Sequence, residues 1–447
     1  MPSDGLFGSL STTPAMAAAV ADEAWLQAML DTEAALARGH AAAGLVSAEV
    51  AEAIAGACRA ERFDLDAVGR EAVGSGTPVL PLVAALRAAL SPETARWVHF
   101  GATSQDIVDT AVMLVSRRGL AVLLDALDGA CDRCAELAER HRSTVMAGRT
   151  LLQQAVPVTF GLKSAGWLVA LVEARARLEQ VRDERLAVQL GGAAGTLAAL
   201  GPDGPAVVSA AATALGLHEP PLPWHTNRVR VAEVATALGV ALGVAGKVAA
   251  DVLLLAQTEV AEVAEATGPG RGGSSTMPHK RNPVGAVAVV ACVRRGQALV
   301  GTVLGSMVHE HERAAGAWQA EWETLRDLFL LSGTAVERLG EVLAGLEVHP
   351  GTMRANLGRS SGLVMAEAVV TTLARRIDRV QADALVAAAG RRALGTNRPL
   401  ADVLAADEAV RVHLSAGELE AALEPEGYLG ATDHFIDRAL AAWRPED

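Results

Sequence analysis

The chain has 447 residues, of which 51% are hydrophobic but only 3% aromatic, and it carries a formal net charge of −13. This acidic balance, without an extended run of Lys and Arg, argues against a nucleic-acid-binding protein. The apolar residues are mostly Ala, Val and Leu. Because Ala and Leu are strong helix formers, this composition favours long helices over a β-rich fold.

The N-terminal residues show no basic segment followed by an apolar run, so no secretory signal is expected. The longest uncharged stretch, 186–202, contains several glycines and is shorter than the ~20 apolar residues of a membrane helix. We therefore expect a cytoplasmic protein without a membrane partner. Cys131 and Cys134 form a C-x-x-C pair inside a helical pattern, where ordinary helix positions are favoured over a zinc or redox site.

Along the chain, helices are predicted between residues 15 and 60. Gly and Pro break the pattern at 74–78, and Ser91 followed by Pro92 indicates a new helix start. From Asp106 to about residue 345 the pattern becomes a set of long helices. Three of them are predicted at 163–190, at 232–266, and from Pro283 to about Glu312.

On the helix at 232–266, the pattern predicts one polar face carrying Asp251, Thr258, Glu262 and Glu265. Long helices without intervening strands indicate a bundle. His349-Pro350-Gly351 marks a boundary after it. The pattern therefore predicts an all-α fold with a central long-helix bundle, followed by a smaller helical C-terminal part.

The stretch 273–283, GSSTMPHKRNP, is the most informative in the chain. It joins a Gly-rich loop, hydroxyl side chains and a cation to a Pro that opens a helix. Backbone N–H groups near a helix start favour anions, and Lys280 adds a full positive charge. Together these groups would hold a carboxylate or stabilise a serine oxyanion.

This stretch resembles the signature loop of the fumarase/aspartase superfamily, in which the first Ser of the pair is the general base. The resemblance implies Ser274 as that base, with Ser275 the less favoured choice. It also implies a catalytic role for Lys280 and a substrate-binding role for Asn282. The reaction of the superfamily removes or adds a proton next to a carboxylate, and the resemblance implies no cofactor and no metal.

Two further stretches are similar to the other signatures of this superfamily. The first is 99–106, HFGATSQD, which implies substrate contacts by Thr103, Ser104 and Gln105, with His99 either at the site or purely structural. The second is 148–153, GRTLLQ, which implies contacts by Arg149, Thr150 and Gln153. In the superfamily the three stretches converge only in a homotetramer with a twenty-helix core, where each active site draws on three subunits. The resemblance also implies three helical domains, which we expect at residues 1–98, at 99–346 as the central long-helix bundle, and at 347–447.

Position 151 narrows the expected reaction. Superfamily members whose leaving group needs a proton carry His directly after the Thr of the second signature, whereas this chain has Leu151. That departure puts fumarase, argininosuccinate lyase and adenylosuccinate lyase activities in doubt. A carboxylate or nitrite leaving group needs no acid.

Several strings resemble the 3-carboxy-cis,cis-muconate cycloisomerase branch of the superfamily: 148–161, 163–167, 224–228, 311–322 and 424–430. The resemblance implies lactonisation of a small polycarboxylate, with Ser274 delivering a proton to carbon. Three alternatives stay open at this point. They are a lyase for another succinate such as nitrosuccinate, an adenylosuccinate-lyase-like enzyme, and a crystallin-like structural protein.

Three more positions have two interpretations each. Arg313 would bind a substrate carboxylate as a fork, or pair on a helix surface with Glu310 or Glu312. His225 would contact substrate, or lie on a Pro-rich loop ordered by packing. His309 and His311 flank Glu310, but a spacing of two does not match a helical zinc pair, so no metal is expected.

Overall fold

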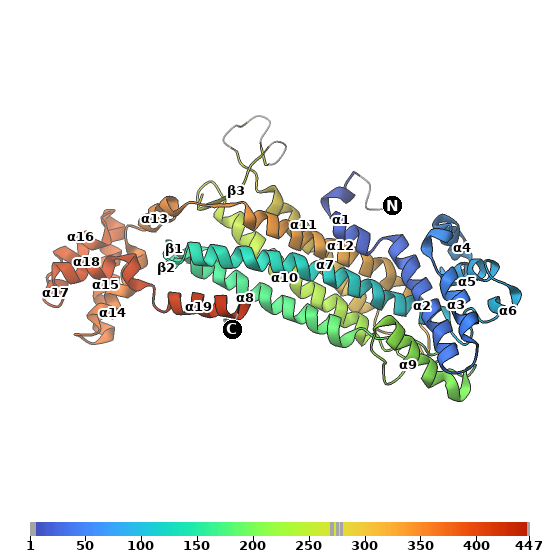
Figure 1. Cartoon of the computed structure of the whole chain (residues 1–447). Helices are drawn as coiled ribbons and strands as arrows, with labels where there is room; N and C mark the ends of the chain where they lie inside the picture. The colour runs from blue at the N-terminus through green and yellow to red at the C-terminus, as the bar shows by residue number, and fades with distance from the viewer. Residues whose placement is uncertain (1–5, 269–271, 274–276, 278–279, 445–447) are drawn as a thin grey trace. The chain divides into compact units, whose positions relative to one another are not determined.

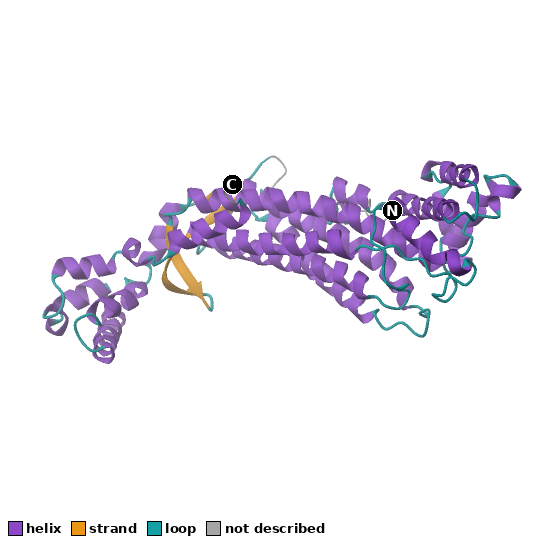
Figure 2. Cartoon of the chain, turned by 60° about the horizontal axis from the view of Figure 1, so that its bottom comes forward, coloured by secondary structure: helices purple, strands orange, loops and turns teal. Residues whose placement is uncertain are grey.

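The computed structural model describes residues 6–268, 272–273, 277 and 280–444. It is built almost entirely from helices (Figures 1 and 2). Helices account for 69% of the structure and strands for only 6%, so the predicted all-α class is confirmed. The few strands form two small antiparallel pairs, β1 with β2 and β3 with β4.

The chain divides into two compact units. Unit 1 comprises Met1–Asp128, Ala174–Gly246 and Ala288–Arg338, and unit 2 comprises Gly129–Glu173, Lys247–Val287 and Leu339–Asp447. The predicted domain boundaries after residues 98 and 346 stay a prediction. Five long helices contribute a segment to each unit: α7 (Ser104–Arg140), α8 (Phe160–Gln180), α10 (Val229–Leu255), α11 (Val284–Gly305) and α12 (Ala317–Ala344).

The shorter helices of unit 1 confirm the N-terminal predictions. Helices fill most of residues 15–60, and the Ser91 side chain accepts a hydrogen bond from the Thr94 N–H as the cap of a helix that starts at Pro92. Ala35 and Leu36 pack against Val207 in one apolar cluster. The helices are α1 (Pro14–Ala19), α2 (Asp22–Ala42), α3 (Ala48–Ala57), α4 (Leu65–Ser75), α5 (Val79–Ala88), α6 (Pro92–Ala95) and α9 (Gly204–Leu215).

Unit 2 holds both strand pairs and a small C-terminal helical group. Val369, Leu373 and Val386 belong to the apolar core of that group. The strands are β1 (Val145–Thr150), β2 (Gln153–Thr159), β3 (Val263–Glu265) and β4 (Leu346–Val348). The helices are α13 (Pro350–Gly358), α14 (Ala366–Leu373), α15 (Arg379–Thr396), α16 (Leu400–Ala406), α17 (Glu408–Arg411), α18 (Ala416–Leu423) and α19 (Thr432–Trp443).

Three predicted helices end earlier than the sequence indicated. Helix α8 gives way to a π-helical turn, Val181–Arg185, and the chain is then extended where Ala187 bridges to His218. Helix α11 ends at Gly305 rather than near Glu312. After α8, the bridge to His218 is a tertiary contact that the local pattern does not contain.

The predicted polar face on α10 was wrong, because this helix ends at Leu255. Thr258 and Glu262 lie beyond the helix, and Glu265 lies in strand β3. The carboxylate of Glu265 accepts hydrogen bonds from the N–H groups of Gly285 and Ala286, at 3.0 and 2.8 Å. These N–H groups open α11 and have no partner within their own helix, so a carboxylate there is stabilising.

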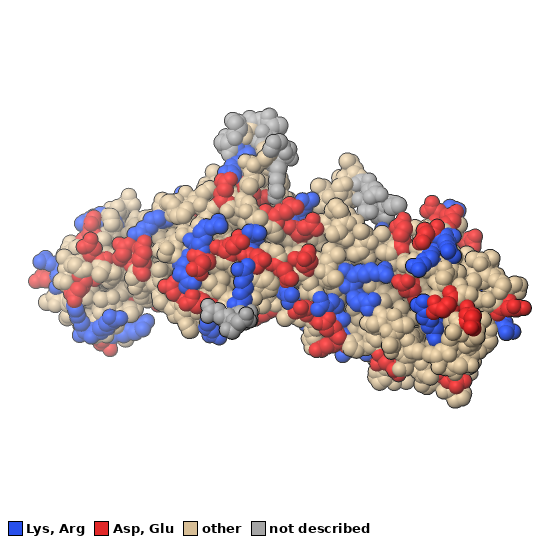
Figure 3. Space-filling view, in the orientation of Figure 1, with Lys and Arg blue, Asp and Glu red and all other residues tan. Residues whose placement is uncertain are grey.

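Helices α10 and α11 are long and apolar enough to cross a membrane by length and composition. Half of the apolar window of α10 and 28% of that of α11 is buried inside the structure. Much apolar helix surface is therefore left exposed by the single chain. On the face drawn in Figure 3, acidic and basic side chains are interspersed over the described residues.

Candidate active site

A buried carboxylate organises the first signature stretch, in unit 1. Asp106 Oδ2 accepts hydrogen bonds from the N–H groups of Thr103 and Gly192, at 3.0 and 2.9 Å. Its Oδ1 accepts from the Gly191 N–H at 2.9 Å and lies 2.7 Å from His225 Nε2. The side chain of Asp106 is fully buried. One carboxylate thus fixes the start of α7, a glycine turn and His225 relative to one another.

The structure also brings Gln105 and Arg313 together. Arg313 Nη1 donates to Gln105 Oε1 at 2.8 Å, and Nη2 donates to the Ala193 carbonyl at 2.7 Å. Gln105 Nε2 in turn donates to Asp109 and to the backbone carbonyl of His225. Arg313 lies in the loop after α11 rather than on a helix. The Arg313 backbone N–H donates to the Glu310 carbonyl at 3.1 Å, but the guanidinium binds Gln105 and Ala193, so the helix-surface ion pair considered from the sequence does not form.

Beneath these residues lies a charge cluster that sequence reasoning missed. Arg228 is bidentate to Asp109, at 2.8 and 3.0 Å, and bidentate to Glu321, at 3.0 and 2.5 Å. Trp318 Nε1 donates to Asp109 at 3.0 Å. Burial by itself lowers the pKa of Arg228, but the two carboxylates outweigh it and the pKa is raised. The available sequence signal was the i, i+3 pair of acids, Asp106 and Asp109, on the apolar helix α7.

His99 is paired with a second buried acid in unit 1, Glu33. His99 Nδ1 lies 2.6 Å from Glu33 Oε1, and the His99 N–H donates to Glu33 Oε2 at 3.1 Å. Burial lowers the pKa of His99, yet the hydrogen bond and charge of Glu33 exceed that effect, so the pKa is raised. His99 also has φ of 61°, an uncommon backbone conformation for a non-glycine residue.

The second signature stretch forms the β1–β2 hairpin of unit 2. Arg149 pairs through both terminal nitrogens with the buried carboxylate of Glu262, at 2.9 and 2.6 Å. Thr150 and Gln153 face each other across the last strand pair, and both are exposed. Lys163 on α8 is half-buried, and burial lowers its pKa while Asp251 partly opposes the shift.

In the third stretch, the described residues frame a loop. Ser274, Ser275 and His279 lie outside the described residues. The Asn282 N–H donates to the Gly272 carbonyl at 2.8 Å, which closes the base of the loop. Lys280 is exposed, and its N–H donates to the Met277 carbonyl at 3.0 Å.

Arg281, beside Lys280, pairs with both oxygens of Glu347 and donates to the Glu265 carbonyl. Of the two cations in this stretch, Arg281 therefore fastens the loop. Lys280 is exposed to solvent as well, and its position beside the loop leaves it to supply charge to a bound anion.

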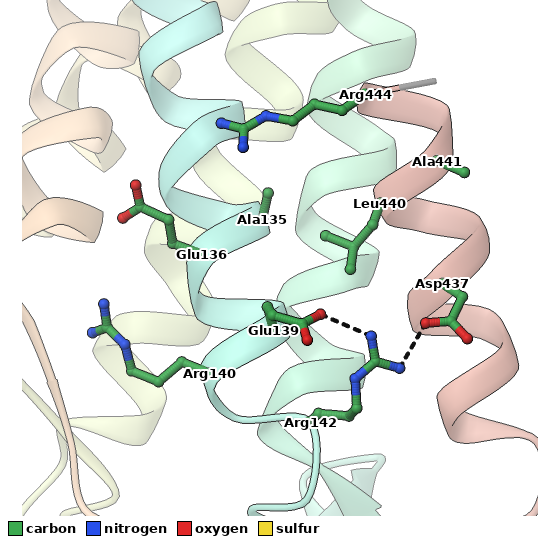
Figure 4. A pocket seen from close by; sticks show the side chains of 9 residues that line it. All are labelled: Ala135, Glu136, Glu139, Arg140, Arg142, Asp437, Leu440, Ala441 and Arg444. Atoms are coloured by element: carbon green, nitrogen blue, oxygen red, sulfur yellow. Dashed lines mark hydrogen bonds and ion pairs between the residues drawn. The ribbon is translucent and has the colours of Figure 1, made fainter. Parts of the chain in front are cut away.

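Three other features, a surface cleft, the possible metal ligands and the C-x-x-C pair, do not form part of the candidate site. A cleft of about 860 Å³ opens between α7 and α19, and three of its charged side chains pair with one another, since Arg142 binds both Glu139 and Asp437 (Figure 4). No residue predicted for the site lines it. Within the described part of the chain, no three His, Cys, Asp or Glu side chains are grouped as a metal site would need. Cys131 and Cys134 are buried, and no disulfide joins them.

Comparisons with known proteins cover nearly the whole chain. The family model described as lyase matches residues 8–295, and the one described as adenylosuccinate lyase C-terminus matches residues 362–439. The chain is 47% identical over 444 residues to a 3-carboxy-cis,cis-muconate cycloisomerase of Pseudomonas aeruginosa, covering 99% of this chain and 97% of that protein. It is 42% identical over 447 residues to a nitrosuccinate lyase of Streptomyces davaonensis, covering 98% and 94%.

A solved structure of the same kind of enzyme also matches the fold of this chain. The crystal structure of the 3-carboxy-cis,cis-muconate lactonizing enzyme from Pseudomonas putida matches with a TM-score of 0.92 and 42% sequence identity. The match covers 98% of this chain and 99% of that chain.

Proposed function

The chain belongs to the lyase family whose sequence model it matches over residues 8–295, and we propose that it converts 3-carboxy-cis,cis-muconate into 4-carboxymuconolactone. The reaction would belong to the protocatechuate branch of the β-ketoadipate pathway. The observation that carries this proposal is the 47% identity to a 3-carboxy-cis,cis-muconate cycloisomerase over 99% of this chain, and the residue that agrees with it is Leu151. It stands between Thr150 and Gln153 at the hairpin tip, where superfamily members that protonate a leaving group carry His. A carboxylate that adds to, or leaves from, carbon needs no such acid.

In the proposed mechanism an oxygen of one substrate carboxylate adds to a carbon of the diene and closes the lactone. The displaced electron pair moves toward a second carboxylate, and Ser274 delivers a proton to the carbon next to it. One C–O bond and one C–H bond form, while one C=C π bond and the Ser274 O–H bond are broken, and the serine oxyanion then takes up a proton from solvent. Lys280 and loop N–H groups would stabilise the charge that develops on the serine oxygen and the substrate.

The remaining predicted residues would bind and orient the three carboxylates. We assign Thr103, Ser104, Thr150, Gln153 and Asn282 to hydrogen bonding with substrate. The cationic face of Arg313, held by Gln105, would supply charge, while Asp106 fixes His225 and the first stretch in place. Arg149 and His99 would contact substrate while their buried carboxylate partners, Glu262 and Glu33, hold them in position.

We also propose a cytoplasmic homotetramer with shared active sites. The exposed apolar surface of α10 and α11 supports this, because other copies of the chain would cover it in a common twenty-helix core. Light scattering should give four times the 46.0 kDa chain mass. A monomeric mass, or recovery in the membrane fraction, would contradict the assembly.

One assay tests the proposed function. The purified protein is mixed with 3-carboxy-cis,cis-muconate, and loss of the conjugated-diene absorbance is followed. We expect Ser274→Ala to lower kcat by at least ~10³-fold, with Ser275→Ala as the matched control that keeps most of the activity. No turnover by the unaltered protein would refute the proposal, and near-normal turnover by Ser274→Ala would refute the role of that serine.

A second candidate is elimination of nitrite from nitrosuccinate, since the chain is 42% identical to a nitrosuccinate lyase and Leu151 fits that reaction equally well. Formation of fumarate from nitrosuccinate, followed spectrophotometrically, distinguishes the two. We expect the higher kcat/KM with 3-carboxy-cis,cis-muconate.

A further inference from the structure

The β1–β2 hairpin ends in a two-residue loop made of Leu151 and Leu152. Thr150 pairs with Gln153, so only the two leucines cross from one strand to the other. Both have positive φ, 51° and 64°. Two positive φ values in a two-residue hairpin loop characterise a type I′ turn, where Asn and Gly are favoured because they tolerate this conformation. Leucine is strained there, since its Cβ crowds the backbone.

The side chains of the two leucines pack little against their own chain, so burial does not offset this strain. Leu151 is 95% exposed and Leu152 is 79% exposed. A pair of large apolar side chains at a strained, exposed tip is disfavoured both by backbone conformation and by hydration. Such a local conflict, retained at one place in an otherwise well-packed fold, points to a function for the side chains.

Positive φ at non-glycine residues occurs in two of the signature stretches, and also outside them at Leu197, Ala261, Ser361 and Asn397. Among the described residues, non-glycine positions with positive φ include His99 in the first stretch and both leucines in the second. His311, which opens the 311–322 string, also has positive φ, at 47°. Strained residues of this kind cluster at catalytic and ligand-binding sites, where the surroundings hold them in place.

We propose that Leu151 and Leu152 form the apolar wall of the substrate site and determine its preference for a carbon-rich substrate. This inference rests on the proposed function. Thr150 and Gln153 offer polar groups to the carboxylates on either side, and the leucines between them would contact the unsaturated carbon chain. The tip projects from its own chain, so a second copy of the chain supplies the opposite wall.

The apolar wall has a definite chemical purpose. The carbon that accepts the proton becomes electron-rich when the lactone closes, and the developing charge is stabilised by fixed hydrogen bonds and cations. These interactions are stronger when water is excluded. The reaction needs no acid at position 151. The leucine that stands there instead would keep water away from the reacting carbon.

The test is a double variant, Leu151→Asn with Leu152→Gly, which installs the residue pair that a type I′ turn favours. Because the strain is relieved, we expect the melting temperature to stay equal or to rise by about 2 °C. Because the apolar contact with substrate is lost, we expect kcat/KM for 3-carboxy-cis,cis-muconate to fall at least ~10-fold. The oligomeric mass should not change.

The control is Leu394→Ala on α15, which removes a leucine that is 70% exposed and far from the signature stretches in sequence. Leu394→Ala should alter neither the melting temperature nor kcat/KM. Retention of kcat/KM within about twofold in the double variant would overturn the proposal. A lower melting temperature together with a smaller oligomeric mass would also overturn it, because the leucines would then hold copies of the chain together. An inactive wild-type protein would instead refute the proposed function.

Discussion

The first signature stretch in unit 1 and the hairpin tip in unit 2 differ in how their side chains are stabilised. In unit 1, Asp106 accepts from backbone N–H groups of three residues and contacts His225, and the side chains of both are buried. At the tip, Leu151 is exposed and strained. The side chains of the first region find their partners within the chain, whereas under our proposal the leucines of the tip would find theirs in the substrate.

This difference predicts how the two regions respond to substitution. Changes in the buried cluster of unit 1 should be detected first as lost stability, because they leave polar groups buried without partners. Changes at the exposed tip should be detected as lost activity in a protein that remains folded. Three substitutions in unit 1 test that contrast.

The largest expected effect is that of Arg228→Leu. Removing the guanidinium leaves the carboxylates of Asp109 and Glu321 buried and unpaired, which should lower the free energy of unfolding by about 3–5 kcal/mol. Chemical denaturation followed by circular dichroism measures this. Arg38→Leu, which breaks the exposed pair with Glu52, is the control and should cost about 1 kcal/mol or less. Equal losses in the two variants would remove the contrast between buried and exposed pairs.

An intermediate effect is expected for Asp106→Asn. An amide offers one acceptor oxygen where the carboxylate offers two, so an N–H of Thr103, Gly191 or Gly192 loses its partner. The cost should be about 1–3 kcal/mol of stability.

Because Asp106 also positions the first stretch, kcat/KM of Asp106→Asn should fall about 10- to 100-fold. Asp125→Asn, on the exposed face of the same helix α7, should leave both quantities unchanged. An Asp106→Asn protein with wild-type stability and turnover would show that this carboxylate does not organise the site.

The smallest effect is a pH dependence from Glu33→Gln. The folded-state pKa of His99 is raised, so its pairing with Glu33 stabilises the fold below the unfolded-state pKa of about 6.5. This stabilisation is lost as the pH rises through the folded-state pKa. The loss of stability in Glu33→Gln should therefore be larger near pH ~6 than near pH ~9.

Unfolding free energies measured at both pH values check this expectation for Glu33→Gln. Glu52→Gln is the control, because its partner Arg38 stays protonated throughout this range. A difference between wild type and Glu33→Gln that does not vary with pH would mean that Glu33 does not raise the pKa of His99.

The sequence alone identified the helical class, the family and the position of most candidate site residues. Helix propensity and periodicity are local properties, so α7, α10 and α12 follow from residues that are close together in the chain. The signature strings are equally local, which is why Gln105, Thr150 and Lys280 were found without coordinates.

Only the tertiary structure determined where the helices stop and which charges are paired. Helix α10 ends at Leu255 although its polar periodicity continues, because Glu262 and Glu265 bind groups distant in sequence. Arg228 gave no signal in the sequence, since its partners lie 119 and 93 residues away. The strain at Leu151 was also invisible, because a backbone torsion depends on the closing strand pair rather than on the residue itself. Local preferences thus fix the elements and the motifs, whereas burial and long-range pairing decide what each charged or strained residue does.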